Sequence, residues 1–295
     1  LNLKGECIYS ERQAFASAAP DNAIPAIKKT VDSAIKSCNR KRNQLLGAGI
    51  VMPGPFGVSG LSALGGANLP NWDGIDIQAA FEKELGCPVI IENDATAAAI
   101  AERVTGAATT IDTFCFVYFG TGLGLGVIAD GHAQRGAFGN FGEIGHIITQ
   151  TGGNQCACGN RGCLETYASR MSVKAHLEKS GLEFQDGSAL AQLLNDGNPD
   201  LLEWIETAAR HLSQAISILE NIFDPETIIL GGAMPDAVMD TLIANLELPK
   251  GSLANRNDRN FARVLRGSSG RFTAAIGGAA MVIHKTTTPS MALFS

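Results

Sequence analysis

The sequence lacks any apolar run that approaches the roughly 18 residues of a membrane-spanning helix, because Gly120 interrupts its most apolar segment, residues 114–119. It also lacks an excess of basic charge. Its 23 lysines and arginines are outnumbered by 29 aspartates and glutamates, which gives a net charge of −6. Because an acidic surface repels the phosphate backbone, we expect this chain by itself neither to span a membrane nor to bind nucleic acid.

Cysteine is too sparse and too irregularly spaced for a disulfide-stapled domain, with seven in 295 residues. Four of them, Cys7, Cys38, Cys87 and Cys115, lie singly in apolar or helical patterns. We expect these four to be buried, reduced thiols of a cytoplasmic protein. The other three lie together between residues 156 and 163 and need a different explanation.

Glycine, in contrast, is abundant: it makes up 34 of the 295 residues, against a usual share of roughly 7%. Such an excess indicates backbone that lies close against a ligand or a phosphate. Hydrophobic residues make up 45% of the chain, enough for a packed core and too many for a disordered protein. The length fits one large domain or two of moderate size.

Apolar runs bounded by turn residues predict strands, and apolar residues at helical spacing predict helices. The expected strands are residues 48–52, 89–91, 114–119 and 227–230, and the expected helices are residues 22–39, 76–85, 95–104, 201–223 and 274–284. Residues 1–9 alternate around Lys4 and Gly5, which predicts a hairpin. Strands that alternate with helices indicate an α/β protein, and we expect two halves to meet near residues 106–113.

The three clustered thiols, Cys156, Cys158 and Cys163, lie in one glycine-bearing loop. Structural zinc takes four tetrahedral nitrogen or sulfur ligands and binds thiolate well. His146, ten residues before the first thiol, is the candidate for the fourth ligand. Four protein ligands leave no position for a catalytic water, so the pattern predicts a structural Zn²⁺. A redox switch of free thiols is the alternative.

A polar triplet, Glu92-Asn93-Asp94, ends the expected strand at residues 89–91. In α/β sheets ligands bind beyond the carboxyl ends of strands. A carboxylate at this place can accept a proton from a substrate hydroxyl while Asn93 orients the same molecule. The alternative is that Asn93 and Asp94 cap the helix expected at residues 95–104, and one residue can do both.

Two glycine motifs follow buried strands. Gly120, Thr121 and Gly122 open a stretch of alternating glycines whose N–H groups can surround an anion, and Gly231-Gly232 is a second candidate for contact with a nucleotide. No Gly-Lys-Ser/Thr is present, and the spacing does not match a dinucleotide fingerprint. A tight hairpin in which small residues only permit close packing is therefore the alternative.

Taken together, these motifs resemble the ROK family of sugar kinases and sugar-responsive repressors over roughly residues 1–285. The resemblance rests on Pro53-Gly54, Asn68-Leu69-Pro70-Asn71-Trp72, Asn93-Asp94, Gly120-Thr121-Gly122, Glu143-x-Gly145-His146, the cysteine loop followed by Glu165, and Asp224-Pro225 leading to Gly231-Gly232. It implies an actin-like, ribonuclease-H-like fold of two lobes with a ligand cleft between them. The smaller lobe would comprise residues 1–105 completed by a final helix at 274–290, and the larger lobe residues 106–273.

The resemblance also implies which residues contact a sugar in the cleft. By position these are Asn68, Asn93, Asp94, Glu143, His146 and Glu165. In kinase members the residue matching Asp94 is the general base, and Gly120–Gly122 matches a phosphate loop. His146 would serve both zinc and sugar. Carboxylates and amides in this density suit a polyhydroxylated ring.

Members of the family that are kinases carry a strand with Asp-x-Gly-Gly-Thr, and we expect that strand to precede Leu1 in the native protein. Several segments look like the sugar-responsive regulators instead, namely residues 116–124, 135–140, 265–267 and the tail 281–295. The favoured hypothesis is therefore the sugar-sensing part of a transcriptional regulator for a hexose or amino sugar. The alternative is a sugar kinase that uses ATP and Mg²⁺.

The expected partners follow from the same resemblance. They are a small sugar and a second copy of the chain, in a homodimer or higher oligomer. DNA would be bound only through a helix-turn-helix that these 295 residues do not contain.

Overall fold

The computed structural model describes residues 1–14, 16–54, 71–72, 74–251, 253–256, 258–268, 270 and 272–287. Its helices are α1 (Pro20–Ser37), α2 (Ile77–Leu85), α3 (Asp94–Thr105), α4 (Arg170–Lys179), α5 (Gly187–Asn195), α6 (Pro199–Phe223), α7 (Asp236–Ala244) and α8 (Thr273–Thr287). Short 3₁₀ turns lie at η1 (Arg42–Gln44), η2 (Ile144–His146) and η3 (Leu164–Thr166). The strands are β1 (Ala48–Met52), β2 (Val89–Asn93), β3 (Phe114–Phe119), β4 (Leu123–Ala129), β5 (His132–Ala133), β6 (Thr227–Gly232) and β7 (Val264–Arg266).

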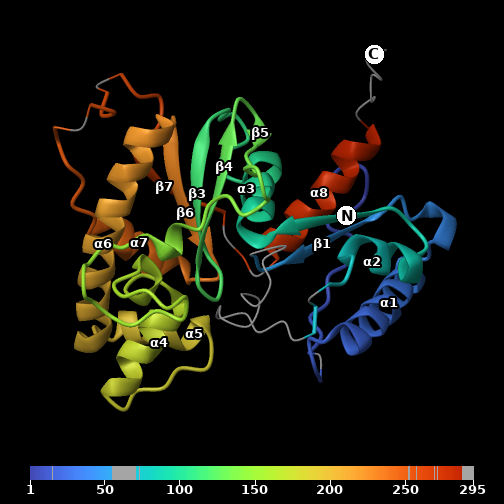
Figure 1. The fold of residues 1–295 in the computed structure, drawn as a ribbon, viewed down its shortest axis with the longest axis horizontal. Helices are drawn as coiled ribbons and strands as arrows, with labels where there is room; N and C mark the ends of the chain where they lie inside the picture. Colours follow the sequence, from blue (N-terminus) through green and yellow to red (C-terminus); the bar gives the residue numbers. More distant parts are fainter. Residues whose placement is uncertain are drawn as a thin grey trace.

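The larger sheet has the strand order β5-β4-β3-β6-β7. Its central strand β3 runs parallel to β6 and antiparallel to β4. Because β3 is apolar at every position, it can be covered on both faces. Cys115, Val117 and Phe119 face a core formed with α4–α7, and Phe114 and Phe116 face a second core formed with α3. The sheet is thus a layer between helices, as Figure 1 shows.

The smaller sheet consists of β1 and β2, which pair in parallel from Ala48–Val89 to Met52–Asn93. Helices α1 and α2 pack on it through a third core that contains Trp72, Phe81 and Leu85. Helix α8, at the far end of the chain, returns to lie against α3 and against this sheet (Figure 1). Glycine permits that approach, because a Cβ at Gly277 would overlap the Ala97 carbonyl of α3.

The expected strands and helices are confirmed, with boundaries that differ by a few residues. The hairpin expected at residues 1–9 is wrong, because this segment contains a turn and no strand. The Asn2 side chain accepts hydrogen bonds from the N–H groups of Lys4 and Glu6, and this closes the turn locally. The prediction that all four single thiols are buried is correct only for Cys115, because Cys7 is exposed and Cys38 and Cys87 are half-buried.

Among the described helices, none combines the length and the apolar composition that crossing a membrane requires. This agrees with the sequence, in which charged or glycine residues interrupt every apolar run.

Candidate functional site

The polar residues that the sequence singled out meet where β2 and β3 end. Asn93 closes β2, and Asp94 begins α3 directly after it. Glu143 precedes the turn η2, and His146 ends that turn. Glu165 lies in η3, after the cysteine loop. Asn68 lies outside the described residues.

Asn93 caps helix α3, as the structural alternative expected. Its Oδ1 accepts hydrogen bonds from the N–H groups of Ala95 at 2.9 Å and Thr96 at 3.4 Å. Its Nδ2 points the other way, since a Cβ on Gly54 would lie 3.0 Å from it and 3.5 Å from Glu143 Oε1. Asn93 therefore stabilises the helix and presents a donor next to a carboxylate, and a side chain at position 54 would crowd that space.

Asp94 is partly buried, and its reduced contact with water is the main cause that raises its pKa to about 6. The Ala95 N–H opposes the shift, and the nearby Glu143 carboxylate adds to it. A Cβ on Gly120 would lie 3.4 Å from Asp94 Oδ2, so this carboxyl faces the glycine turn between β3 and β4. Burial of the Tyr118 ring, with the nearby charge of Asp94, raises the pKa of Tyr118 to about 12.

His146 lies between two carboxylates. Its Nε2 is 3.9 Å from Glu143 Oε2, and its Nδ1 is 3.7 Å from Glu165 Oε1. Burial raises the pKa of Glu143, Glu165 adds to the rise, and His146 opposes it. One nitrogen of the imidazole thus faces the acidic site, while the other faces the cysteine loop.

The four predicted zinc ligands come together, with their ligand atoms all within 4.8 Å of one another. His146 Nδ1 is 3.6 Å from Cys156 Sγ, and Cys158 Sγ is 3.7 Å from Cys163 Sγ. Tetrahedral zinc with bonds of about 2.3 Å to sulfur and 2.0 Å to nitrogen separates its ligands by roughly 3.5–3.8 Å. The donor set and its spacing therefore fit a four-coordinate zinc ion.

Glu165 connects this cluster to the glycine turn. Its Oε1 lies 3.3 Å from Cys156 Sγ, and a Cβ on Gly122 would lie only 2.7 Å from its Oε2. In β4, Cβ atoms on Gly124 and Gly126 would instead meet the side chains of Ala95 and Ala99. The alternating glycines thus include positions that permit helix packing as well as the turn at Gly120, Thr121 and Gly122.

The second glycine pair ends β6, where Gly231 is opposite Tyr118 and Gly232 is opposite Phe119. Gly232 lines a cavity of about 1120 Å³, together with Arg170 at the start of α4 and the segment 233–236. This volume slightly exceeds the usual range for ligand pockets. The sequence analysis named the glycines at this cavity but missed Arg170, because Arg170 lies in none of the motifs that it identified.

Sequence reasoning also missed the partner of Glu92. Although this residue is 7% exposed, its carboxylate accepts a hydrogen bond from Arg135 Nε at 2.8 Å. Arg135 follows β5 of the larger sheet, so the pair links the two sheets one residue before Asn93. The sequence could have indicated this pair, because Glu92 is a charged residue in an apolar strand and a buried carboxylate requires a partner.

The fold is thus that of an α/β protein with two sheets that share helices. A loop with four potential metal ligands lies beside a site rich in carboxylates. The whole chain is similar to proteins of known function. The xylose repressor of Bacillus subtilis is 28% identical over 284 residues, which cover 96% of this chain and 72% of the repressor. A glucokinase of Halalkalibacterium halodurans is 30% identical, with 74% of this chain and 70% of the relative covered. The regulator NagC of Escherichia coli is 28% identical over 80% of this chain and 60% of its own length.

Solved structures agree on the fold. A ROK glucokinase from Streptomyces griseus, crystallised with glucose and AMPPNP, superposes with a TM-score of 0.75 at 25% identity over 94% of this chain and 92% of its own. A ROK transcriptional regulator, a homologue of the Escherichia coli MLC protein, superposes with a TM-score of 0.72 at 24% identity, over 95% of this chain and 74% of its own. Residues 1–285 match the ROK family, and the chain belongs to it. The predicted actin-like two-lobed fold is confirmed.

Proposed function

We propose that this chain is the sugar-sensing domain of a ROK-family transcriptional regulator. The observation that carries the proposal is the convergence of Asn93, Asp94, Glu143 and His146 beside the open backbone of Gly54. A sugar offers several hydroxyls in fixed directions, each both donor and acceptor, and this group supplies amide, carboxylate and imidazole partners. A hexose or an amino sugar is the expected ligand.

Match length does not separate the two candidates, because a xylose repressor aligns over 96% of this chain and a ROK glucokinase superposes over 94%. The proposal of a regulator therefore rests on the segments that look regulator-like. Several described segments that look regulator-like border the site, including the strand β3 and the segment with Arg135 that binds Glu92. Recognition of DNA would then come from a helix-turn-helix outside these residues.

A structural Zn²⁺ belongs to this proposal. His146, Cys156, Cys158 and Cys163 would hold it, and their spacing and donor chemistry fit it. When bound, the ion would fold the loop onto His146 by coordinating Nδ1, which leaves Nε2 for the sugar. Glu165, next to Cys156 Sγ and Gly122, would orient the sugar from the same side.

A sugar kinase is the second candidate, and the raised pKa of the partly buried Asp94 favours it. A carboxyl with a pKa raised to about 6 is poised to accept a proton near neutral pH, and it faces Gly120. ATP with Mg²⁺ would supply the phosphoryl group. Gly120, Thr121, Gly122, Gly231 and Gly232 would contact its phosphates, with the cavity at Gly232 as the place for the nucleotide.

The larger-scale features of the proposal follow from the same family. They are a smaller lobe of residues 1–105 completed by residues 274–290, a larger lobe of residues 106–273, and a homodimer or higher assembly in the cytoplasm. All seven cysteines are free thiols in the structure, which is compatible with a reducing compartment.

Calorimetry with a panel of sugars, alongside an ATP-coupled assay, tests both candidates on wild type and Asp94→Asn. For a sensor we expect no turnover and a roughly ten- to hundredfold weaker sugar affinity in the variant, because one charge-assisted hydrogen bond is lost. For a kinase we expect turnover to fall about 10²–10⁴-fold with a smaller change in affinity.

Glu206→Gln is the matched control, because it neutralises an exposed carboxyl on α6, away from the site. Turnover with any sugar would refute the sensor. Sugar affinity that is unchanged by Asp94→Asn, Glu143→Gln and Asn93→Ala alike would place the sugar elsewhere under either candidate.

A further inference from the structure

A second cavity lies on the side of helix α3 that faces α8, away from the proposed sugar site. Its volume is about 580 Å³, within the range of small-molecule pockets. Strand β2, helices α3 and α8 and the β4–β5 hairpin form its walls, and Figure 1 shows α3 between the hairpin and α8. Asp94 starts α3, whereas Arg103 at the cavity is nine residues further along, which corresponds to roughly 14 Å of helix.

The lining separates into an apolar floor and a basic rim. The floor includes Ile90, Ile100, Ile128 and Met281. The rim carries Arg103, His132, Arg135, His284 and Lys285, and none of the described residues that line the cavity is acidic. In a chain with net charge −6, this cavity thus gathers two of the five histidines and three of the 23 lysines and arginines.

The arginines are held in place mainly by groups outside the lining, with the Ala133 carbonyl as the exception. Arg103 donates to Thr109 O at 2.7 Å and Asp112 at 2.6 Å, and its buried Nε has no hydrogen-bond partner among the described residues. Arg135 uses Nε for Glu92 and Nη1 for Ala133 O. A guanidinium has five N–H donors, so these contacts orient both groups and leave donors for a ligand.

We propose that this cavity binds a small amphipathic monoanion, whose carboxylate or comparable acid group meets the basic rim and whose apolar body lies on the isoleucine floor. Charge complementarity selects the anion, because cationic groups in a partly enclosed, low-dielectric site attract negative charge more strongly than in water. The apolar floor excludes a bare inorganic anion as the preferred ligand, since such an ion gains nothing from it. The cavity is distinct from the sugar site, although Arg135 reaches from its rim to Glu92 beside Asn93, and sugar titration is a separate measurement.

Calorimetry on the purified protein tests the proposal with octanoate and 1-naphthoate, each compared with its neutral alcohol. We expect one-to-one binding of an acid, at least about tenfold tighter than its alcohol, because only the acid gains the rim charges. The two acids distinguish an alkyl from an aromatic body.

Two variants locate the binding. Lys285→Glu reverses an exposed charge in the last turn of α8 and is expected to weaken acid binding about tenfold or more. Lys36→Glu makes the same change in the last turn of α1, away from the cavity, and is expected to stay within about twofold of wild type. Val104→Trp, at a half-exposed position of the wall, fills the cavity and is expected to abolish binding without a loss of thermal stability.

Equal affinity for acid and alcohol, or equal effects of Lys285→Glu and Lys36→Glu, would overturn the proposal. So would a dimer in sedimentation that Lys285→Glu dissociates, because a second copy of the chain would then cover this face. If Val104→Trp fails to fold, the lysine pair still decides the outcome.

Discussion

Asp94 is a partly buried carboxyl at the first turn of α3, and its titration affects the stability of the fold. Its pKa in the folded protein is about 6, above the usual 3.8, so the folded state holds the proton more tightly than the unfolded state. Below about pH 4 both states are protonated and the residue has no effect. As pH rises from about 4 to about 6 the folded state loses up to about 3 kcal/mol of stability, because the unfolded state ionises first, and above pH 6 the loss is complete.

We therefore expect Asp94→Asn to raise the free energy of unfolding at pH 7.5 and to make no difference below about pH 4. Thermal unfolding at several pH values between these limits measures the effect. Glu206→Gln, at an exposed position, should show no such pH dependence. A variant that is less stable than wild type at pH 7.5 would contradict the inferred burial of the charge.

A substitution of Cys158, one of the four proposed ligands, tests the zinc site. The Cys158 sulfur lies 3.7 Å from that of Cys163, as expected of two ligands of one ion. We expect Cys158→Ser to lower zinc content and melting temperature together, because structural zinc contributes folding energy directly. Sugar affinity should fall as well, since His146 borders both sites.

Elemental analysis and thermal unfolding measure these effects, with Cys38→Ser as the control. Cys38 is a single thiol at the end of α1, far along the chain from the loop. Carefully prepared wild type without zinc would end the metal assignment.

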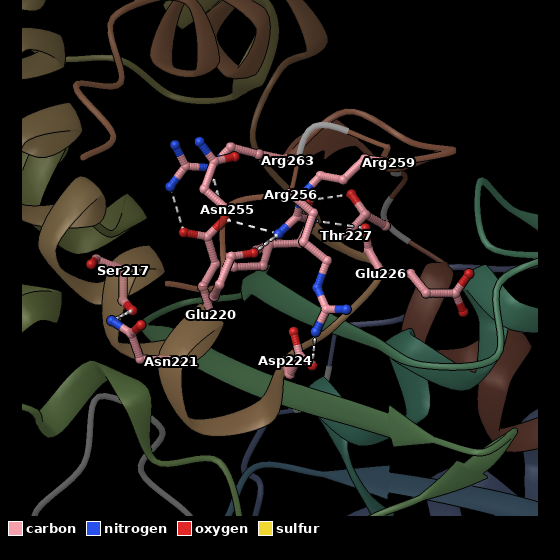
Figure 2. Close-up of polar contacts among 12 residues, drawn as sticks. Ser217, Glu220, Asn221, Asp224, Glu226, Thr227, Asn255, Arg256, Arg259 and Arg263 are labelled. Atoms are coloured by element: carbon pink, nitrogen blue, oxygen red, sulfur yellow. Dashed lines mark hydrogen bonds and ion pairs between the residues drawn. The ribbon is translucent and has the colours of Figure 1, made fainter. Parts of the chain in front are cut away.

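At the scale of elements, a buried ion pair joins α6 to the chain just before β7. Glu220 on α6 is 1% exposed and receives two hydrogen bonds from Arg263, at 2.8 and 2.6 Å (Figure 2). A second guanidinium, that of Arg259, has its Nη2 3.7 Å from Oε1 of Glu220. The Arg263 guanidinium thus compensates a carboxylate that has almost no access to water.

We expect Arg263→Met to destabilise the protein by about 3–5 kcal/mol, because it leaves a buried charge without its main partner. The double variant Glu220→Leu/Arg263→Met should recover most of that loss. Denaturant unfolding measures both. Arg256→Met removes the exposed pair with Asp224, also visible in Figure 2, and should cost about 1 kcal/mol or less. An equal cost for both single variants would show that Glu220 is not effectively buried.

At the scale of the whole molecule, the contact between α3 and α8 joins the two sheets. Gly277 of α8 lies against the Ala97 carbonyl, and Gly49 of β1 lies against Gly278, so backbone meets backbone on both sides of α8. Helix propensity alone predicts that Gly277→Ala stabilises the protein by up to about 1 kcal/mol. The packing predicts the opposite sign, because the added methyl must push α8 away from α3.

We expect Gly277→Ala to lower the free energy of unfolding by about 1–3 kcal/mol, in the range of other overpacked cores. Thermal unfolding measures it, with Gly251→Ala as the control, since no atom lies within 4 Å of a Cβ at that position. A stabilised Gly277→Ala would mean that α8 can shift without cost.

Much of the fold could be predicted from local pattern. The strands Ala48–Met52 and Phe114–Phe119 agree with the sequence prediction, because continuous apolar runs between turn residues have few other structures available. The ROK family and its actin-like fold were likewise recognisable from motif order. The hairpin predicted at residues 1–9 was wrong because a strand requires a partner, which local alternation of residues cannot supply. The Asn2 side chain closes a turn there instead.

The residue types of the candidate site are determined by the sequence alone: three thiols and a histidine at metal spacing, and an Asn-Asp pair after a buried strand. Only the tertiary structure decided their relations. It turned the two nitrogens of His146 toward different carboxylates, buried Asp94 enough to raise its pKa, and brought Arg135 from the other sheet to Glu92. Local chemistry depends on residues near in sequence, whereas burial and charge pairing depend on elements far apart in the chain, which only the packed fold brings together.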